Sequence, residues 1–410
     1  MMLFFSIICL LFAIQLVYPF VTVVLEQVFG SNSRQSSISQ YPDTSILDFA
    51  CIITAYRNAD IAQPLVESLL RQTHPKFKIY LVADECPDFD FGFTHERFVT
   101  LRPSEPLRLK AKSLLHAIEN FQNPHDFIAV FDADNLAHPA FLAEINRFAN
   151  AGFRCIQGQR TAKNLSTTYA ALDSMGEHYK NYIEREVPFR LGGSAVISGS
   201  GMATEAGLYK AYLASPEIEQ GKKQWKKMLQ EDKILQNFLL RRGERIAYAR
   251  EAIVYDEKVE HGEAVETQRS RWLFSYFQNV PNALGIFRRG ITGFNFNQLY
   301  FGFVTLAMPM FIQLGLAMGL MLLALFIAPI WSAVLLVAIS IFALNILWSL
   351  RLDGAPAEVW NAVWQVPKFI LRQFSGLFKM RNPNKYFKHT EHRKMVSLDD
   401  VIDRNPDSQP

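Results

Sequence analysis

Three groups of polar residues in the 410-residue sequence have side chains that could bind phosphate and activate a hydroxyl. The first is Asp132-Ala133-Asp134, which directly follows the apolar run 127–131. Two carboxylates one residue apart at a strand end can bind one hard cation, Mg²⁺ or Mn²⁺, together with phosphate oxygens. Such a cation would neutralise a diphosphate leaving group. A solvated acidic turn is the alternative interpretation, because so short a motif often occurs by chance.

The second group is Glu231-Asp232, which opens a helical pattern over residues 233–242 that stops at Gly243. A carboxylate here could act as a general base, because a sugar hydroxyl is a poor nucleophile until its proton is removed. The alternative is helix capping, since acidic residues in a first turn complement the helix dipole.

The third group is Gln268, Arg271 and Trp272, which share one face if residues 268–272 are helical. The guanidinium matches phosphate geometry, and the indole offers a flat apolar surface to a sugar ring. A membrane-surface helix with an interfacial Trp and a snorkelling Arg fits the same residues.

The elements that must position these groups alternate along the chain. Short apolar runs predict strands at 49–54, 78–83, 97–101 and 127–131, and helical spacing of apolar residues covers 61–72 and 106–121. This alternation predicts an α/β domain with a mostly parallel sheet and flanking helices. Ligands bind such sheets at the carboxyl ends of the strands, where the first acidic group lies.

Apolar runs predict about three transmembrane helices. Residues 2–25 carry no charge and are long enough to span a bilayer, and residues 301–350 read as a hairpin split near Ala328-Pro329. A cleaved signal peptide is the alternative for the first run, but no Lys or Arg precedes it. The organisation that we expect is an anchor at 1–26, a linker at 27–46, a catalytic domain at 47–280, an interfacial helix at 281–300, the hairpin at 301–350 and an interfacial helix with a basic tail at 351–410.

Charge predicts which side of the membrane the domain occupies. Arg351, Lys368 and the basic residues that follow should lie in the cytoplasm, which places residues 26–300 there too. A net charge of only +3 argues against nucleic-acid binding. We therefore expect an integral protein of a bacterial plasma membrane with a cytoplasmic catalytic domain.

Taken in order, the acids and the Gln-x-x-Arg-Trp run resemble the family-2 glycosyltransferases. The membrane-embedded branch is the most similar, the one with cellulose, chitin and hyaluronan synthases and ceramide glucosyltransferase. The resemblance covers residues 49–280 and extends to the membrane segments. It implies a nucleotide-diphospho-sugar transferase (GT-A-like) fold and a nucleotide-sugar donor, a UDP-sugar of the glucose or N-acetylglucosamine type.

The resemblance also assigns roles to residues of this sequence. On the donor side it implies nucleotide or diphosphate contacts for Tyr56, Asp84, Lys112, Asp132, Gln268 and Arg271, with Asp132 and Asp134 holding Mg²⁺ or Mn²⁺. On the acceptor side it implies contacts for Gly199, Ser200, Gly201, Glu231 and Trp272, with Asp232 as the general base. The sequence departs from the family pattern at Ala59, Ala111 and Gln230, where the family has Glu, Gly and Thr.

These assignments imply a single displacement that inverts the anomeric centre. The expected product is a growing β-linked polysaccharide, which in a chain of about three spans would need an oligomer or an export partner. Transfer of one sugar to a lipid acceptor is the alternative, and an inactive scaffold subunit is a third.

Overall fold

A computed structural model describes residues 2–30, 45–224, 230–378 and 396–402. Most of the expected linker and most of the basic tail lie outside these residues. Within them, eight strands form one sheet in the order β3-β2-β1-β4-β7-β6-β8-β5. The strands are β1 (Phe49–Tyr56), β2 (Phe77–Asp84), β3 (Phe98–Leu101), β4 (Phe127–Asp132), β5 (Leu136–Ala137), β6 (Cys155–Ala162), β7 (Met202–Glu205) and β8 (Ile246–Asp256).

The four predicted strands are confirmed as β1 to β4, and they pair in parallel. Strands β1, β2 and β4 are apolar because both faces of the sheet are covered there, and every residue of Phe49–Ile53 is fully buried, whereas the edge strand β3 is partly exposed. The other half of the sheet is mixed. Strand β7 runs antiparallel to β4 and β6, β5 runs antiparallel to β8, and β6 pairs in parallel with β8. The α/β prediction is therefore confirmed as a mixed, GT-A-like sheet.

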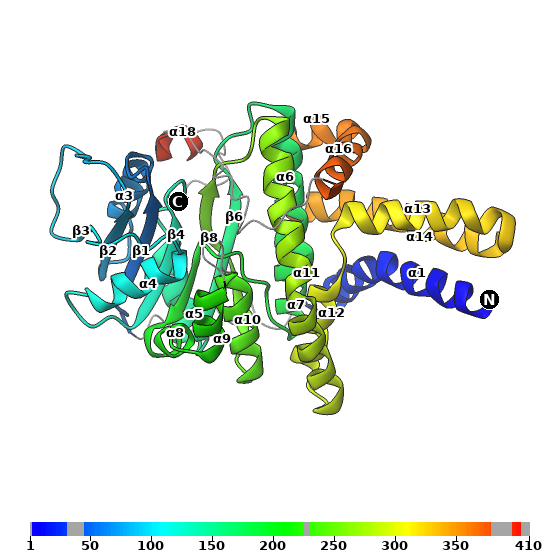
Figure 1. Cartoon of the computed structure of the whole chain (residues 1–410), viewed down its shortest axis with the longest axis horizontal. Coiled ribbons are helices and arrows are strands. Elements are labelled where there is room, and N and C mark those ends of the chain that lie inside the picture. The colour runs from blue at the N-terminus through cyan, green and yellow to red at the C-terminus, as the bar shows by residue number, and fades with distance from the viewer. Residues whose placement is uncertain (1, 31–44, 225–229, 379–395, 403–410) are drawn as a thin grey trace.

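Helices flank this sheet (Figure 1). The predicted helices at 61–72 and 106–121 are shorter in the structure, which has a 3₁₀ turn η2 (Asp60–Ala62), α3 (Gln63–Leu70) and α4 (Lys110–Glu119). Further along the chain are α5 (Phe141–Asn150), α6 (Thr168–Lys180), the π-helix η3 (Asn181–Glu186), α7 (Val187–Arg190), α8 (Ala206–Leu213), α9 (Pro216–Gln224) and α10 (Glu231–Arg241).

Two long helices follow the sheet and differ from the expected boundaries. Helix α11 (Gly262–Thr292) continues through Pro281, so no separate element begins at 281, and α12 (Phe296–Leu306) returns antiparallel along it. The two backbones approach so closely that a Cβ on Gly290 would lie 2.2 Å from the backbone nitrogen of Leu299. Pro281 has no N–H and leaves one backbone hydrogen bond of α11 unmade. The tight packing of α12 compensates for this loss and lets α11 continue past the proline.

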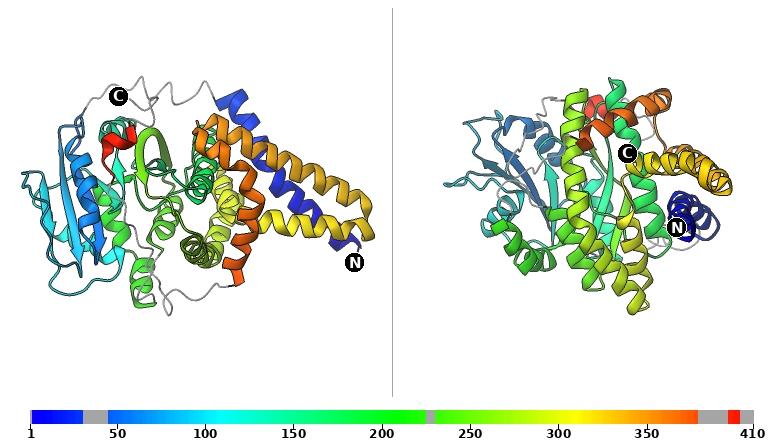
Figure 2. Two further views of the ribbon diagram at one scale, coloured as in Figure 1. Left: turned by 90° about the horizontal axis from the view of Figure 1, so that it is seen from above. Right: turned by 45° about the vertical axis from the view of Figure 1, so that its right-hand side comes forward.

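Three helices are long and apolar enough to cross a membrane: α1 with its π-helical extension η1 (Met2–Gly30), α13 (Met310–Ile327) and α14 (Pro329–Leu352). They project from one side of the sheet domain (Figures 1 and 2), and α14 packs against both α1 and α13. The expected hairpin begins at Met310 rather than at 301, because Pro309 separates α13 from α12. Then come α15 (Ala357–Ala362), η4 (Val363–Gln365), α16 (Val366–Phe378) and α18 (Leu398–Ile402).

Candidate active site

The carboxyl ends of the parallel strands bring three predicted site residues to one edge of the sheet. Tyr56 ends β1 beside Asp84, which ends β2, and Asp132 ends β4 beside Thr54. The 198–201 loop reaches the same edge, because the Gly201 N–H donates to the carbonyl of Val130 at 2.9 Å.

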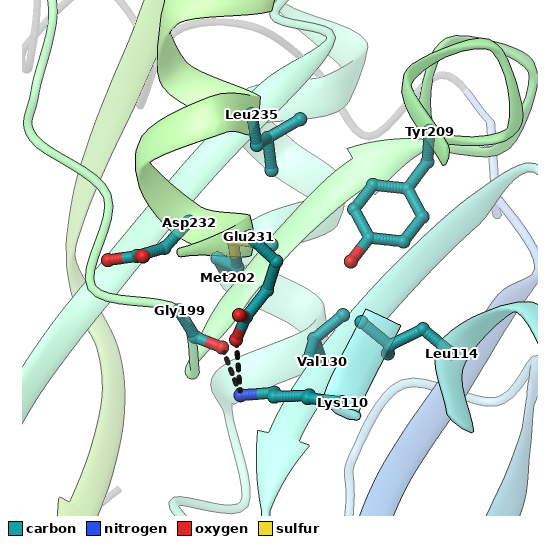
Figure 3. A pocket seen from close by; sticks show the side chains of 9 residues that line it. All are labelled: Lys110, Leu114, Val130, Gly199, Met202, Tyr209, Glu231, Asp232 and Leu235. Carbon is teal, nitrogen blue, oxygen red and sulfur yellow. Dashed lines mark hydrogen bonds and ion pairs between the residues drawn. The ribbon is translucent and has the colours of Figure 1, made fainter. Parts of the chain in front are cut away.

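A lysine occupies the centre of this edge. Lys110 Nζ lies 2.6 Å from Asp132 Oδ1, 3.9 Å from Glu231 Oε1, and donates to the Gly199 carbonyl at 2.8 Å. Figure 3 shows Lys110 and Glu231 pointing toward each other, with Asp232 on the other side of the start of α10. The two predicted acidic groups, at Asp132 and at Glu231, therefore lie in the same cluster, because both contact the ammonium of Lys110.

This cation is not the one that the sequence analysis selected. Lys112 is exposed on α4, whereas Lys110 is the lysine that reaches the acids. Two residues apart on an α-helix are rotated by about 200°, so both cannot face the same site. The neighbouring Lys110 was missed because the sequence does not fix the rotation of α4 against the sheet.

The charges in this cluster depend on one another. Burial alone would raise the pKa of Asp132, but the Lys110 ammonium, with help from Arg160, outweighs it and holds that pKa below its usual value. Burial raises the pKa of Glu231 to about 7 against the opposing effect of Lys110, and the neighbouring Asp232 raises it further. Burial would lower the pKa of Lys110, yet Asp132 and Glu231 raise it. At neutral pH the site thus holds an ammonium, an ionised Asp132 and a half-titrated Glu231.

The predicted acceptor loop has a backbone that requires glycine. Gly199 has φ +82° and Gly201 has φ +60°. A Cβ on Gly199 would lie 3.4 Å from the Cβ of Asp232, so Asp232 packs directly over the loop. Ser200 is fully buried, which places its side chain inside the domain rather than on the acceptor surface.

One buried amide holds that loop in place. Gln157 Nε2 donates to the carbonyls of Ser200 and Gly201, each at 3.1 Å, and Gln157 Oε1 accepts from the N–H of Ser198 at 2.9 Å. A narrow pocket lies between the loop and α10 (Figure 3). Its lining residues are Lys110, Leu114, Val130, Gly199, Met202, Tyr209, Glu231, Asp232 and Leu235.

Asp84 is buried and accepts two backbone hydrogen bonds, from Leu107 N at 2.9 Å and Arg108 N at 2.6 Å. It therefore fixes the loop before α4, and a carboxylate has lone pairs left for a ligand. Tyr56 lies nearby under the guanidinium of Arg57, 5.0 Å from the ring centre. Arg57 and Arg108 both have positive φ, +64° and +58°. Such backbone strain clusters at functional sites.

The turn after β4 is organised by Asn135. Its side-chain oxygen accepts from Asp132 N at 3.1 Å, and its amide donates to Asp134 Oδ1 at 3.3 Å. Lys163 Nζ donates to the carbonyl of Asp134 at 2.7 Å. Among the described residues, no group of three or more His, Cys, Asp and Glu side chains could hold a metal alone. Asp132 and Asp134 fit a divalent cation whose other ligands are phosphate oxygens, the usual arrangement for Mg²⁺.

The predicted Gln-x-x-Arg-Trp face lies on α11. Trp272 is 39% exposed and contacts two cations, with Lys180 Nζ 4.6 Å and the Arg269 guanidinium 4.5 Å from its ring centre. The indole that was expected to bind a sugar ring is therefore partly exposed and partly in contact with cations. Burial lowers the pKa of Arg271, and Gln268 Oε1 is buried without a hydrogen bond.

A buried layer of charged side chains connects the two halves of the predicted site. Lys258 Nζ lies 2.9 Å from Asp256 Oδ1 and 3.6 Å from Glu177 Oε2. Arg160 pairs with Asp256 and donates to the carbonyl of Ser198 at 3.2 Å. On the side nearer Trp272, Arg269 pairs with Asp173 at 2.7 Å. Sequence reasoning missed this layer, although Asp256 ends β8 and would have been found by inspecting the ends of further strands.

Residues 47–275 match the model of the family described as Glycosyltransferase like family 2. No curated protein sequence matches the chain. Among solved structures, the mannosyltransferase PcManGT from Pyrobaculum calidifontis, in complex with GDP-Man and Mn²⁺, has a TM-score of 0.53 at 15% identity, over 86% of this chain and 97% of that one. TarS 1–349 from S. aureus gives a TM-score of 0.38 at 13% identity, over 58% of this chain and 66% of that one.

The family model covers more than half of the chain, including the strand-end acids, the 198–201 loop, the start of α10 and the Gln-x-x-Arg-Trp face. The site built from the strand ends therefore belongs to an enzyme that transfers a sugar from a nucleotide-sugar donor, and the chain is a member of glycosyltransferase family 2.

Proposed function

We propose that this protein is an inverting, metal-dependent glycosyltransferase of the membrane-embedded branch, and that it transfers one sugar to a membrane lipid acceptor. The observation that carries the proposal is the cluster of Lys110, Asp132 and Glu231 beside Asp232, at the carboxyl ends of the strands. It combines cationic and acidic groups for a diphosphate with a carboxylate that has access to an acceptor.

Asp232 is the proposed base. Its side chain is 24% exposed at the start of α10, whereas Glu231 faces Lys110. The acceptor O–H gives its proton to Asp232, and the oxygen attacks the anomeric carbon. The bond from that carbon to the phosphate oxygen breaks, and the nucleoside diphosphate leaves with the electron pair. Attack opposite to the leaving group inverts the anomeric centre, so an α-linked donor gives a β-linked product.

Two cations of the chain are proposed to stabilise the charge on the leaving group. Lys110 is positioned to interact with a phosphate oxygen once a donor approaches Asp132, and Arg271 on α11 is the proposed second contact. Asp132 and Asp134 would hold Mg²⁺ or Mn²⁺, which supplies charge neutralisation to the diphosphate when bound. Turnover should therefore be lost in excess EDTA and recovered with Mn²⁺ or Mg²⁺. Full turnover in EDTA would contradict this part.

The packing of the spanning helices supports a lipid acceptor. Helices α1, α13 and α14 contact one another mainly through small and apolar side chains, including Ala13, Leu16, Ala317 and Ala338, each at most 8% exposed, with one hydrogen bond from Trp331 Nε1 to Ser6 Oγ. This is a packed interior, whereas a passage for a polysaccharide would be lined by polar groups. The polysaccharide product expected from the sequence would need further chains to form that passage.

The site would work at the cytoplasmic surface of a bacterial plasma membrane. Arg250 donates to the carbonyl of Leu352 at 3.0 Å, and His178 Nδ1 lies 2.7 Å from Asp353 Oδ2, so the sheet domain is bound to the end of α14. The basic residues Arg351 and Lys368 favour placing this end inside.

Membranes that contain the protein should be incubated with radiolabelled UDP-glucose, UDP-N-acetylglucosamine and GDP-mannose in separate reactions. We expect label in the organic-solvent fraction with one donor, and none with Asp232→Asn. Label in an ethanol-insoluble polymer would instead indicate polysaccharide synthesis. No transfer with any donor, from a protein that also fails to bind the nucleotide diphosphates, would contradict the proposal.

A further inference from the structure

The C-terminal helix α18 lies beside the sheet near α3, well apart from α16 (Figure 1). Its start is capped by Ser397, whose Oγ donates to Asp400 Oδ2 at 2.8 Å and accepts from Asp400 N at 3.2 Å. Arg71, at the end of α3, donates to Asp399 at 2.8 Å across 328 positions of sequence. The helix is thus held at a defined place on the catalytic domain.

The surface beneath α18 is the outermost ladder of the sheet. Leu398 and Val401 are 4% and 3% exposed and pack against Leu136 and Tyr255, both fully buried. Leu136 and Tyr255 oppose each other where β5 pairs with β8. Because β5 is the last strand of the sheet and has only two residues, α18 covers an edge that would otherwise be open.

Leu136, one of the two residues that α18 covers, is next to the Asp132–Asp134 turn. Leu136 directly follows Asn135, whose side chain accepts from Asp132 N and donates to Asp134 Oδ1. A shift of Leu136 would move Asn135 and, through these two hydrogen bonds, both aspartates.

Tyr255, the other residue that α18 covers, is connected to the same turn through contacts made by β8. Tyr255 directly precedes Asp256, which pairs with Arg160. Arg160 also donates to the carbonyl of Ser198, in the loop whose Gly199 shares Lys110 with Asp132. One apolar contact therefore supports the acidic turn from two strands at once.

We propose that α18 positions the Asp132–Asp134 turn for binding of the metal and the diphosphate. Leu398 and Val401 are positioning residues in this view, since they touch neither ligand. The inference rests on the proposed metal-binding role of Asp132 and Asp134. If α18 only stabilised the sheet edge, its loss would lower the melting temperature and leave ligand affinity in the folded protein unchanged.

The test measures Mn²⁺ binding by electron paramagnetic resonance on the purified full-length chain, with UDP and in parallel with GDP. Leu398→Asp combined with Val401→Asp should weaken Mn²⁺ binding about 10-fold or more, the range seen when support around metal ligands is lost. Val401→Ala is a milder variant should the double variant not fold. The matched control is Ile46→Asp, because Ile46 is 50% exposed and lies outside the α18 contact, and it should bind Mn²⁺ like the wild type.

Rescue separates positioning from stability. A chain that ends at residue 395 should regain Mn²⁺ affinity when a synthetic peptide of residues 396–410 is added, and a peptide with Leu398→Asp should fail to restore it. Wild-type Mn²⁺ affinity in Val401→Ala and in the truncated chain, despite lower melting temperatures, would overturn the inference. If instead Asp134→Asn binds Mn²⁺ as tightly as the wild type, the proposed metal site itself is wrong.

Discussion

The partly exposed Glu231 and the buried Glu186 both have pKa values raised to about 7, chiefly by burial. Glu231 starts α10 and lines the pocket beside Lys110. Glu186 ends η3, where Arg250 lies 2.9 Å away and Arg190 lies 3.7 Å away.

The neighbours of the two carboxyls connect them to different parts of the molecule. Arg250 also binds the carbonyl of Leu352, and Arg190 also pairs with Glu26 at the end of the first spanning helix. Glu186 therefore joins the sheet domain to its membrane helices, whereas Glu231 borders the pocket at the strand ends. A perturbed pKa identifies a buried carboxyl, and its neighbours decide whether the residue serves binding, catalysis or assembly.

The largest effect on activity is expected at Asp232, the neighbour of Glu231. Asp232→Asn should lower transfer by about 10²–10⁴, the usual loss when a general base is removed, and leave nucleotide diphosphate binding near wild type. The amide keeps the size and shape of the side chain but cannot take a proton. Calorimetry and transfer assays on the same preparation provide the measurement, with the exposed Asp88→Asn as control.

Near-normal transfer by Asp232→Asn would remove Asp232 from the catalytic role and leave it as an acidic residue in the first turn of α10, whose N-cap is Gln230. The base would then have to be sought at Glu231, the other carboxyl of the pocket.

A smaller effect distinguishes the two lysines of α4. Lys110→Met should weaken nucleotide diphosphate binding by about 10- to 100-fold, because a charge-assisted hydrogen bond contributes about 1.5–3 kcal/mol. Lys112→Met should change it little, since that side chain is exposed. Titration calorimetry with Mn²⁺ present measures both variants. A larger loss in Lys112→Met would restore the original sequence assignment.

The sequence predicts the apolar half of the molecule well. Strands β1, β2 and β4 are buried on both faces and stand out as apolar runs, and each spanning helix is long and apolar with at most one charged residue near its end. The sequence also predicts correctly that Asp132 ends a strand, that Asp232 lies at the start of a helix and that Trp272 lies on a helix. These positions follow from the apolar pattern of the neighbouring residues.

The other half is harder to predict because charged and polar residues interrupt its strands. Strand β6 reads Cys-Ile-Gln-Gly-Gln-Arg-Thr-Ala, and Arg250 and Glu251 divide β8 into two short apolar runs. The effect of a proline on a helix boundary also could not be predicted from the sequence. Pro309 separates α12 from α13, whereas Pro281 lies inside α11, which packs tightly against α12. The side of α4 that faces the sheet, and hence the choice of Lys110 over Lys112, is likewise a tertiary property.

The smallest expected effect is a difference in pH dependence between Glu231→Gln and Glu186→Gln. In the unfolded chain each glutamate titrates near its ordinary value of about 4.3, and in the folded protein near 7. Between these values the folded state binds more protons, so the stability contribution of each group is full below about pH 4 and is lost as pH rises through 7. Either Gln variant should therefore flatten the fall in melting temperature between pH 5 and pH 8.

Activity should respond at only one of the two positions. Ionised Glu231 gives Lys110 a second anionic partner in the pocket, so kcat/KM of the wild type should rise as pH passes through 7. Glu231→Gln should lose that rise, and Glu186→Gln should keep it while sharing the flattened stability curve. Profiles of kcat/KM from pH 5.5 to 8.5, with melting curves on the same samples, test this. A rise that persists in Glu231→Gln and disappears in Glu186→Gln would mean that the membrane junction, rather than the pocket, controls titration of the enzyme.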